Sequence, residues 1–431
     1  MRKCLILLLT AVIHLSVNAQ QNITAFKGAL IYTGTGKSIT NGVLIVQNGK
    51  VITVGDASTS IPVNAQVVDM TGKVIIPGIV DTHSHIGGPE GGDRSSPLNP
   101  DIRVLDAVNP TSKAFKKALA GGLTTVNIMP GSGQLMSGQT IYVKLREATT
   151  IEDLLVTNDR GVYGGIKMAN GTNPMNGIPG YPGTRSKSAA MDRDLFMKAV
   201  EYKKKIDKAG KDSTKFPDRD LRMEPLVEVL NGKRIVHFHT HKANDILTVL
   251  RLQKEFGFRV VLHHVTEGYL VAKEIAAAKV PCSIINVDAP GGKAEAMNLW
   301  TGNGGVLEKA GVLTAIHTDD GITDSRFLLR SAALSVRDGM SREEALKALT
   351  INGAKMLDLE KRVGSLETGK DADFVILSGD PFSVYTYVLQ TWVEGIKRFD
   401  LSNPADKAYA VGGFGVYSQD AITHAHEDDH D

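Results

Sequence analysis

Apolar segments alternate with helical segments through the centre of the chain, and this alternation limits the fold more than any other feature. The apolar segments have the length of β-strands and lie at residues 124–130, 164–171, 234–240, 258–264, 280–286 and 311–320. Strands that are apolar on both faces and separated by helices are typical of a parallel sheet covered by helices. With the segment "VIIPGIVDTHSH", about eight strands follow one another over roughly 240 residues, the usual size of a (β/α)8 barrel. The sequence therefore predicts an α/β fold built on such a barrel.

Two regions outside the barrel carry short alternating segments instead. In residues 25–73 the pair Asn48-Gly49 stands between two apolar runs and predicts a β-hairpin. Similar segments return in "VGSLETGKDADFVILSGDP" and "TWVEGIKRFD". We expect the two regions to pair into one small β-sandwich. The predicted domains are a signal peptide at 1–19, a β-sandwich formed by 20–73 and 362–400, the barrel at 74–361, and a tail at 401–431 whose polar end "HAHEDDHD" we expect to be disordered.

The first residues, "MRKCLILLLTAVIHLSVNAQQ", have the parts of a secretory signal peptide. A basic start, an apolar run of about a dozen residues and a small-residue cleavage site follow in order. The run is short for a membrane span. We expect cleavage after Ala19, which leaves a periplasmic or secreted protein without a membrane anchor. Cleavage removes Cys4, and Cys282 alone cannot form an intrachain disulfide.

The charge balance excludes two classes of partner. The chain has 49 Lys and Arg against 47 Asp and Glu, a net charge of +2. Binding to nucleic acid or to an acidic membrane would require clustered positive charge. We therefore expect a small-molecule substrate rather than a nucleic acid. The sequence leaves the oligomeric state open, with a homo-oligomer among the alternatives.

The histidines are concentrated at the ends of predicted strands. Of the 12 histidines, His14 belongs to the expected signal peptide and three more lie in the polar tail. The other eight form four clusters, at 83/85, 237/239/241, 263/264 and 317. Each cluster lies at the C-terminal end of a predicted barrel strand, and barrel active sites are built at that face from several strand ends. The distribution therefore predicts one histidine-rich site.

Strand geometry indicates which side chains share that site. Residues i and i+2 point to the same face of a strand, so His83 and His85 are expected to project together into the barrel mouth. The neighbours His263 and His264 are expected to point to opposite faces, so that only one is a ligand. Imidazoles combined with a carboxylate such as Asp319 suit a divalent ion, zinc first. A water molecule at an open position of such an ion becomes acidic enough to act as a nucleophile at neutral pH.

Taken in order, the motifs "PGIVDTHSH", "HFHTH", "LHH", "AIHTDD" and "GSLETGKDADFVIL" resemble the metal-dependent amidohydrolase superfamily. The resemblance is closest to its imidazolonepropionase-like and prolidase-like branch and covers the chain from about residue 25 to residue 400. It implies a (β/α)8 barrel that holds one or two metal ions. It also implies a metal-activated water that hydrolyses an amide or another C–N bond.

The resemblance also implies roles for individual residues. The implied metal ligands are His83, His85, Lys167, His239, His264 and Asp319. Lys167, in "GGIKMANGTNP", matches a lysine that is carboxylated by carbon dioxide and bridges two ions. Asp319 would be the catalytic residue, as general base and then general acid. The alternative is that Lys167 makes a salt bridge or binds a substrate anion. The roles of His237, His241 and His317 stay open, as do the residues that bind substrate.

We therefore expect an exported amidohydrolase with two zinc ions per chain, or one if Lys167 is not a ligand. Its expected substrate is a dipeptide, an N-acyl amino acid or a cyclic amide. Arg185 is a candidate for pairing with a substrate carboxylate, with a surface arginine as the alternative. The first rival is a mononuclear deaminase or cyclic-amide hydrolase of the imidazolonepropionase type. The second rival is a non-catalytic exported metal-binding protein.

Overall fold

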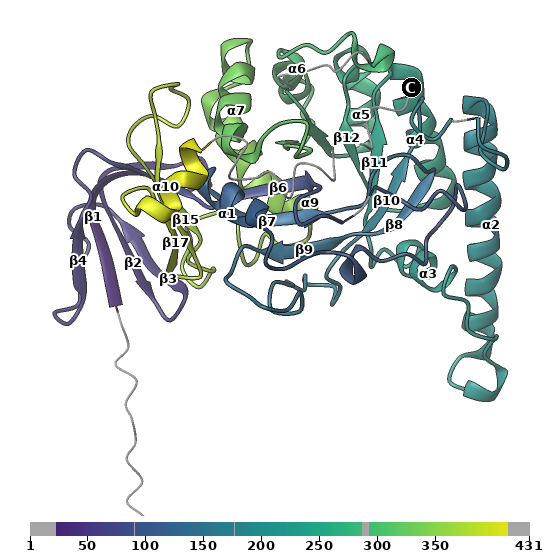
Figure 1. Cartoon of the computed structure of the whole chain (residues 1–431), viewed down its shortest axis with the longest axis horizontal. Helices are drawn as coiled ribbons and strands as arrows, with labels where there is room; N and C mark the ends of the chain where they lie inside the picture. The colour runs from purple at the N-terminus through teal and green to yellow at the C-terminus, as the bar shows by residue number, and fades with distance from the viewer. Residues whose placement is uncertain (1–22, 90, 176, 287–292, 413–431) are drawn as a thin grey trace, which may run out of the picture.

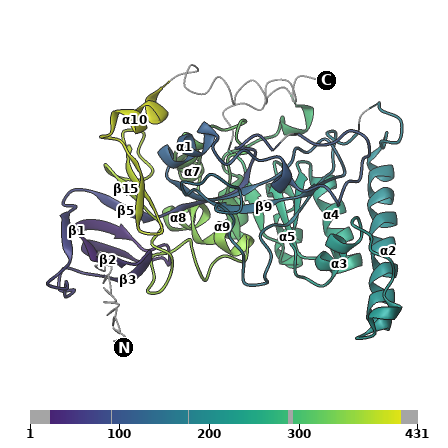
Figure 2. The ribbon, with the colours of Figure 1, turned by 60° about the horizontal axis from the view of Figure 1, so that its bottom comes forward.

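The computed structural model describes residues 23–89, 91–175, 177–286 and 293–412, so the expected signal peptide and the end of the tail lie outside the described residues. A β domain forms one end of the molecule and a strand-and-helix region forms the rest (Figure 1 and Figure 2). The strands of the β domain are β1 (Ile23–Tyr32), β2 (Ser38–Gln47), β3 (Lys50–Gly55), β4 (Gln66–Asp69), β5 (Val74–Pro77), β15 (Phe374–Leu377), β16 (Val388–Val393) and β17 (Ile396–Asp400).

The two ends of the chain meet in the β domain. β5 pairs with β15 in antiparallel fashion, which joins the N-terminal strands to the C-terminal ones in a single sheet ordered β17-β16-β15-β5-β1-β2-β3, with β4 on β1. The sheet is curled. β1 and β16 are three strands apart, which is about 14 Å in a flat sheet, yet the rings of Phe26 and Trp392 are 5.1 Å apart. The expected sandwich is thus one sheet folded over an aromatic core.

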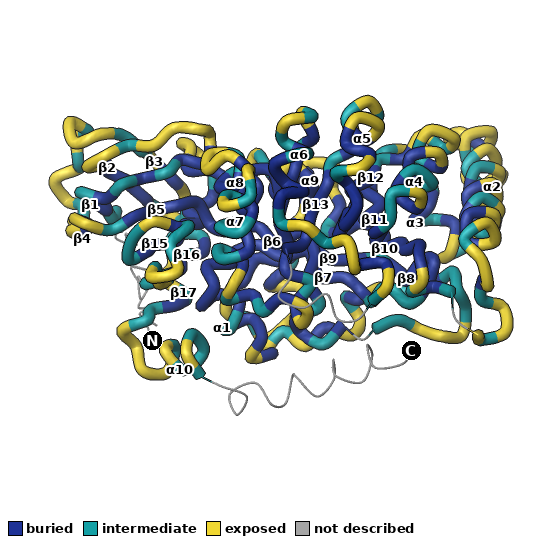
Figure 3. The backbone as a smooth tube through the Cα atoms, turned by 90° about the horizontal axis from the view of Figure 1, so that it is seen from above, coloured by how far each residue is buried: buried dark blue, intermediate teal, exposed yellow. Residues whose placement is uncertain are grey.

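The second region holds the other strands and most of the helices. Its strands are β6 (Ile79–Ser84), β7 (Leu123–Ile128), β8 (Met136–Gln139), β9 (Ile141–Lys144), β10 (Ile166–Ala169), β11 (Val236–Thr240), β12 (Val260–His264), β13 (Cys282–Ile284) and β14 (Thr314–Ile316). Its helices are α1 (Lys113–Ala120), α2 (Arg185–Ala209), α3 (Glu224–Leu230), α4 (Ala243–Phe256), α5 (Ala272–Ala278), α6 (Asn303–Lys309), α7 (Leu328–Arg337), α8 (Arg342–Leu349) and α9 (Ile351–Met356). Figure 3 shows that the buried residues of this region lie mainly in its strands, whereas the exposed residues lie mainly in the surrounding helices and loops.

The strand ladders differ from a closed, all-parallel barrel at two places. β8 and β9 are separated only by Thr140, and they run antiparallel to β10 and β7 respectively. No helix of the described chain lies between β7 and β8, and a return without a crossover helix has to be antiparallel. Within the described residues, the ladders do not pair β14 with β6. Two backbone hydrogen bonds join the segments beyond them, from Asp319 N to His83 O at 2.9 Å and from His85 N to Asp320 O at 3.0 Å.

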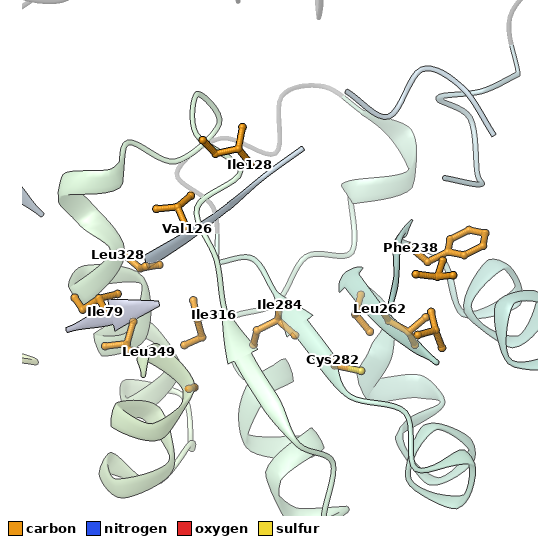
Figure 4. Packing of buried hydrophobic residues seen from close by; sticks show 14 of the residues in the cluster. Ile79, Val126, Ile128, Phe238, Leu262, Cys282, Ile284, Ile316, Leu328 and Leu349 are labelled. Carbon is orange, nitrogen blue, oxygen red and sulfur yellow. The ribbon is translucent and has the colours of Figure 1, made fainter. Parts of the chain in front are cut away.

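Side chains alternate along the inner strands between two faces. One face packs in the apolar core, and the other carries the candidate site. Phe238, Leu262, Ile284 and Ile316 belong to the large apolar cluster between strands and helices (Figure 4). The opposite face forms layers inside the ring of strands. The lowest layer contains Ile235, Val261 and Ala315, closed from below by Met356 of α9. The next positions along the same strands, two residues further on, are the histidines 237, 263 and 317.

Residues 404–411 of the expected tail form helix α10 (Pro404–Val411) instead. Asn403 caps its first turn by accepting a hydrogen bond from Ala405 N at 3.0 Å. Its last residues are tied to the other region, because Arg326 donates to the carbonyl groups of Ala410 and Gly412. The sequence "HAHEDDHD" lies outside the described residues.

Candidate metal centre

The structure brings all six predicted site residues to one end of the ring of strands. His83, Lys167, His239 and His264 lie in β6, β10, β11 and β12. His85 and Asp319 lie just beyond β6 and β14. The strands that carry them run parallel and therefore end on the same side. The side chains of Lys167 and the three strand histidines are buried.

One group of donor atoms is formed by His83, His85 and Asp319. Nε2 of His83 and Nε2 of His85 are 3.3 Å apart. Oδ1 of Asp319 lies 3.3 Å from the first of these nitrogen atoms and 2.9 Å from the second. Lys167 Nζ lies 3.0 Å from His83 Nε2, on the same group. Nδ1 of His85 donates to the carbonyl oxygen of Met129 at 2.7 Å, which orients the ring so that its Nε2 faces the carboxylate of Asp319.

A second group is formed by His239, His241 and His264, and one ring nitrogen of each lies within 4.8 Å of those of the other two. The rings of His239 and His264 are 4.2 Å apart. Nδ1 of His239 is hydrogen-bonded to Ser132 Oγ at 3.0 Å, and Nδ1 of His241 to Thr266 Oγ1 at 2.7 Å. The sequence predicted two of these three residues as ligands and left His241 open.

The expectation that His263 and His264 point to opposite faces is wrong. The rings of both lie close to that of His83, with centroids 4.9 and 4.8 Å away. His264 is the last residue of β12 and has a φ of +70°, in the left-handed region that non-glycine residues rarely adopt. Strand alternation ends at that residue, so the second imidazole turns into the site beside the first.

The remaining histidines form a hydrogen-bonded layer below the donor groups. His237 Nδ1 lies 3.0 Å from His263 Nε2, and His237 Nε2 lies 3.2 Å from the hydroxyl of Tyr142. His317 stacks on His83 with ring centroids 4.9 Å apart, and its Nδ1 is 2.8 Å from Ser283 Oγ. These contacts hold the rings that surround His83 in fixed orientations.

Burial keeps five imidazoles of the site neutral, those of His83, His237, His239, His264 and His317. It lowers the pKa of His83, His239 and His264 well below the usual value. It lowers the pKa of His237 and of His317 to about 3. A neutral imidazole is the form that binds a metal ion.

The pKa values of Lys167 and Asp319, two further predicted ligands, are shifted as well. Burial lowers the pKa of Lys167 to about 7, although the charge of Asp319 opposes this. Burial alone would raise the pKa of Asp319, but the hydrogen bond and charge of His85 and the charge of Lys167 lower it well below the usual value. Asp319 is therefore a carboxylate at neutral pH, and burial favours the neutral amine of Lys167.

This donor set fits a divalent cation. Neutral imidazole nitrogens and an ionised carboxylate are the ligands that zinc takes in catalytic sites. Nε2 of His239 and Nε2 of His264 are buried and have no hydrogen-bond partner among the described residues, which is costly unless an ion or a water binds them. The residues that would hold ions are the two donor groups described above together with Lys167.

Several residues around the site carried no signal in the sequence. Met129 contributes its backbone carbonyl to His85 and its Sδ, 3.2 Å from Lys167 Nζ. Ser132 lies in a glycine-rich loop, and Glu295 lies in a short 3-10 helix with its carboxylate 4.0 Å from His239. Arg185 is not a free surface residue, because its Nε lies 2.9 Å from the buried carboxylate of Asp245.

Comparison with known proteins gives a consistent relationship. The sequence model of the Amidohydrolase family matches residues 223–396. A crystal structure of an amidohydrolase from Thermotoga maritima MSB8 is 37% identical, with a TM-score of 0.82, and the match covers 88% of this chain and 100% of that one. An imidazolonepropionase from Alkaliphilus metalliredigens is 24% identical over 81% of this chain and 86% of its own length. The amidohydrolase tasK of Hapsidospora irregularis is 26% identical over 89% of this chain, which spans 44% of its length.

The ring of strands with a β domain and a histidine-rich mouth defines a metal-dependent hydrolase, and the chain belongs to the amidohydrolase superfamily. It is an enzyme that hydrolyses carbon–nitrogen bonds in small molecules. The fold is of the TIM-barrel type with an added β domain.

Proposed function

We propose that the protein is an exported amidohydrolase that hydrolyses a dipeptide, an N-acyl amino acid or a cyclic amide with two divalent ions, zinc first. The observation that carries the proposal is the arrangement at the barrel mouth. One donor group contains His83, His85 and Asp319, a second contains His239 and His264, and Lys167 lies against the first. The imidazolonepropionase relative supports a cyclic amide among the candidate substrates.

When bound, the ions would make a water molecule acidic and polarise the substrate carbonyl. The proton of that water would pass to Asp319, which is ionised at neutral pH and so has room for it. Asp319 would then give the proton to the leaving nitrogen. His85 keeps the carboxylate in place through the 2.9 Å contact of its Nε2 with Oδ1.

Lys167 is proposed as the residue that links the two ions. Its amine is buried, and burial lowers the pKa of Lys167 to about 7, which favours the neutral form of the amine. The neutral nitrogen can attack the carbon of carbon dioxide and lose one proton, which gives a carbamate with two oxygens. An ammonium beside two dications would be repelled, whereas the carbamate supplies negative charge.

The metal content and a substrate screen test this proposal together. The zinc-loaded protein is assayed for hydrolysis of dipeptides, N-acyl amino acids and cyclic amides, and its ions are counted by elemental analysis. We expect two ions per chain. Lys167→Ala should lose one ion and most activity, with partial rescue by added short carboxylates. One ion in the wild type and an unchanged count in the variant would establish the mononuclear deaminase or cyclic-amide hydrolase instead.

Export is proposed from the first 19 residues, which lie outside the described part of the chain. None of the helices in the described ranges combines the length and apolar character needed to cross a bilayer. Expression of the full chain in a bacterium, fractionation and N-terminal sequencing test the proposal. We expect a periplasmic or secreted protein that begins at Gln20. A cytoplasmic protein with an intact N-terminus would contradict it.

A further inference from the structure

Glu295 has a buried carboxylate beside the second donor group. It is not among the predicted metal ligands. It lies in the 3-10 helix η4 (Ala294–Ala296), and its relative exposure is 1%. Oε2 accepts a hydrogen bond from Thr172 N at 2.8 Å and lies 4.0 Å from Arg185 Nη2. Oε1 has no hydrogen-bond partner in the described structure. A buried carboxylate oxygen without a partner is costly, so this atom needs a ligand.

The unpartnered oxygen faces an unpartnered nitrogen. Glu295 Oε1 lies 4.0 Å from His239 Nε2, and both atoms are buried without a hydrogen bond to any described residue. A hydrogen bond between nitrogen and oxygen would need about 2.7–3.2 Å. Two donors that each lie about 2.0–2.2 Å from one zinc ion are up to about 4.4 Å apart. The separation is therefore too long for a hydrogen bond and short enough for a shared cation.

The backbone leaves space for the carboxylate in this position. Gly171, which follows β10, has a φ of +79°, and a Cβ placed there would lie 2.4 Å from Oε2 of Glu295. Only glycine fits at that position without moving the carboxylate. Gly171 and Thr172 N together form a cradle that holds Oε2, so that Oε1 points to His239.

We propose that Glu295 is a further ligand of the ion held by His239, His241 and His264. This inference rests on the proposed function, since it requires a metal ion in the second donor group. Three imidazoles and one carboxylate make a donor set that zinc accepts. The carboxylate also supplies a negative charge to a group that otherwise contains only neutral rings.

Metal binding by Glu295→Gln tests the inference. Zinc affinity is measured by titration against a chelator, ion content by elemental analysis, and ligand type by the visible spectrum of the cobalt-substituted protein. The variant should bind one of its ions at least about 10–100-fold more weakly, the effect of losing an outer partner of a metal ligand. Its cobalt spectrum should change, because one ligand is lost. Glu295→Asp, which keeps the charge but shortens the side chain, should weaken the same ion.

Glu267→Gln is the matched control. Glu267 is also a buried carboxylate beside this group, but Ala243 N and Asn298 Nδ2 each donate to one of its oxygens. Its substitution should leave zinc affinity and cobalt spectrum unchanged. A Glu295→Gln protein with wild-type affinity and spectrum would overturn the inference and leave a bridging water as the partner of both atoms. Wild-type protein that binds no ion would contradict the proposed function itself, and that result is read before any variant is made.

Discussion

Individual side chains at the barrel mouth are held in place by hydrogen bonds to residues outside the two donor groups. The carbonyl of Met129 can only accept, so Nδ1 of His85 donates to it and the ring is held with Nε2 toward Asp319. Asp81 of β6 holds the end of its own strand and the segment after β14 together, because it accepts hydrogen bonds from the backbone N–H of His83 and from the hydroxyl of Thr318. Burial raises the pKa of Asp81 to about 7. The orientation of the ligands is thus set by groups that never touch the ion.

Asp319→Asn tests the proton acceptor at the same scale. The amide can still coordinate an ion through its oxygen but cannot take a proton, so much of the metal should remain while turnover falls by about 10²–10⁴-fold. Steady-state rates and elemental analysis of the purified variant measure the two effects. Asp324→Asn serves as the control, since that carboxylate caps helix η5 (Ser325–Phe327) and pairs with Arg326. Turnover near the wild-type rate in Asp319→Asn would remove Asp319 from the mechanism.

Whole strands and helices followed their sequence patterns more closely than their ends did. The apolar periodicity of "NDILTVLRLQKEFG" predicts a helix over 244–257, which the structure has as α4 (Ala243–Phe256). The hairpin expected at Asn48-Gly49 joins β2 to β3, with both residues at positive φ. Apolar periodicity and turn residues are local signals, so they could be read from the sequence. The segment "SREEALKALTINGAKML" from Ser341 predicts one continuous helix, but the structure divides it into α8 and α9 at Thr350, which has a φ of −132°. Such a break depends on tertiary packing.

In the candidate site, too, local sequence signals were predictive and features set by tertiary contacts were not. The histidine clusters were visible because each follows an apolar strand, but the inward turn of His264 depends on a single backbone angle after the strand. Glu295 was missed because it lies about ten residues beyond β13 in a segment without strand or helix periodicity. The antiparallel course of β8 was missed because its direction follows from the length of its connection. Contacts made between distant segments leave no periodic trace in the sequence.

The packing of β10 against β11 makes a prediction about an element. A Cβ on Gly165 would lie 2.4 Å from Ile235 O and 2.5 Å from the ring of His237. Gly165→Ala should therefore push the two strands apart and lower the free energy of unfolding by about 1–3 kcal/mol, the usual cost of overpacking. Urea unfolding of the chelator-treated protein measures it. Gly133→Ala is the control, because no described atom lies within 4 Å of a Cβ there. Equal stability of the two variants would contradict the prediction.

Over the whole molecule, the buried histidines predict a metal-free protein that is sensitive to acid. Seven of them have lowered pKa values: His83, His237, His239, His241, His263, His264 and His317. In the unfolded chain each of these imidazoles titrates at about pH 6.5. Below that pH the unfolded chain binds more protons than the native one, so stability decreases as the pH falls. Each group contributes about 1.4 kcal/mol per pH unit in that range.

Four buried carboxyls with raised pKa values oppose part of this effect: Asp81, Asp192, Asp245 and Asp373. These carboxyls bind protons in the native state. The net number of protons taken up on unfolding is therefore smaller than the histidines alone would give. Urea unfolding of the chelator-treated protein at about pH 7.5, 6.5 and 5.5 measures the slope. We expect stability to fall toward acid. A free energy of unfolding that stays constant or rises would contradict the prediction.

A buried charge cluster joins the two regions of the molecule. Lys144 of β9 is fully buried, and its Nζ lies 2.7 Å from Asp371, 3.0 Å from Asp373 and 3.2 Å from Glu394 of the β domain. Lys144→Met would leave these carboxylates without their shared buried cation, and we expect a loss of about 3–5 kcal/mol in the free energy of unfolding. Urea unfolding near neutral pH measures it. The control is Lys198→Met, which removes an exposed pair with Asp194 and should change stability little.

The pairing of β5 with β15 also has a consequence in time. Residues 74–77 and 374–377 are synthesised far apart, with the whole ring of strands and helices between them. Until the ribosome has released the last strands, β5 presents one unpaired edge, and such an edge can join a strand of another chain. A protein with this topology is therefore exposed to misassembly during the final stretch of its translation, after its catalytic half has already been made.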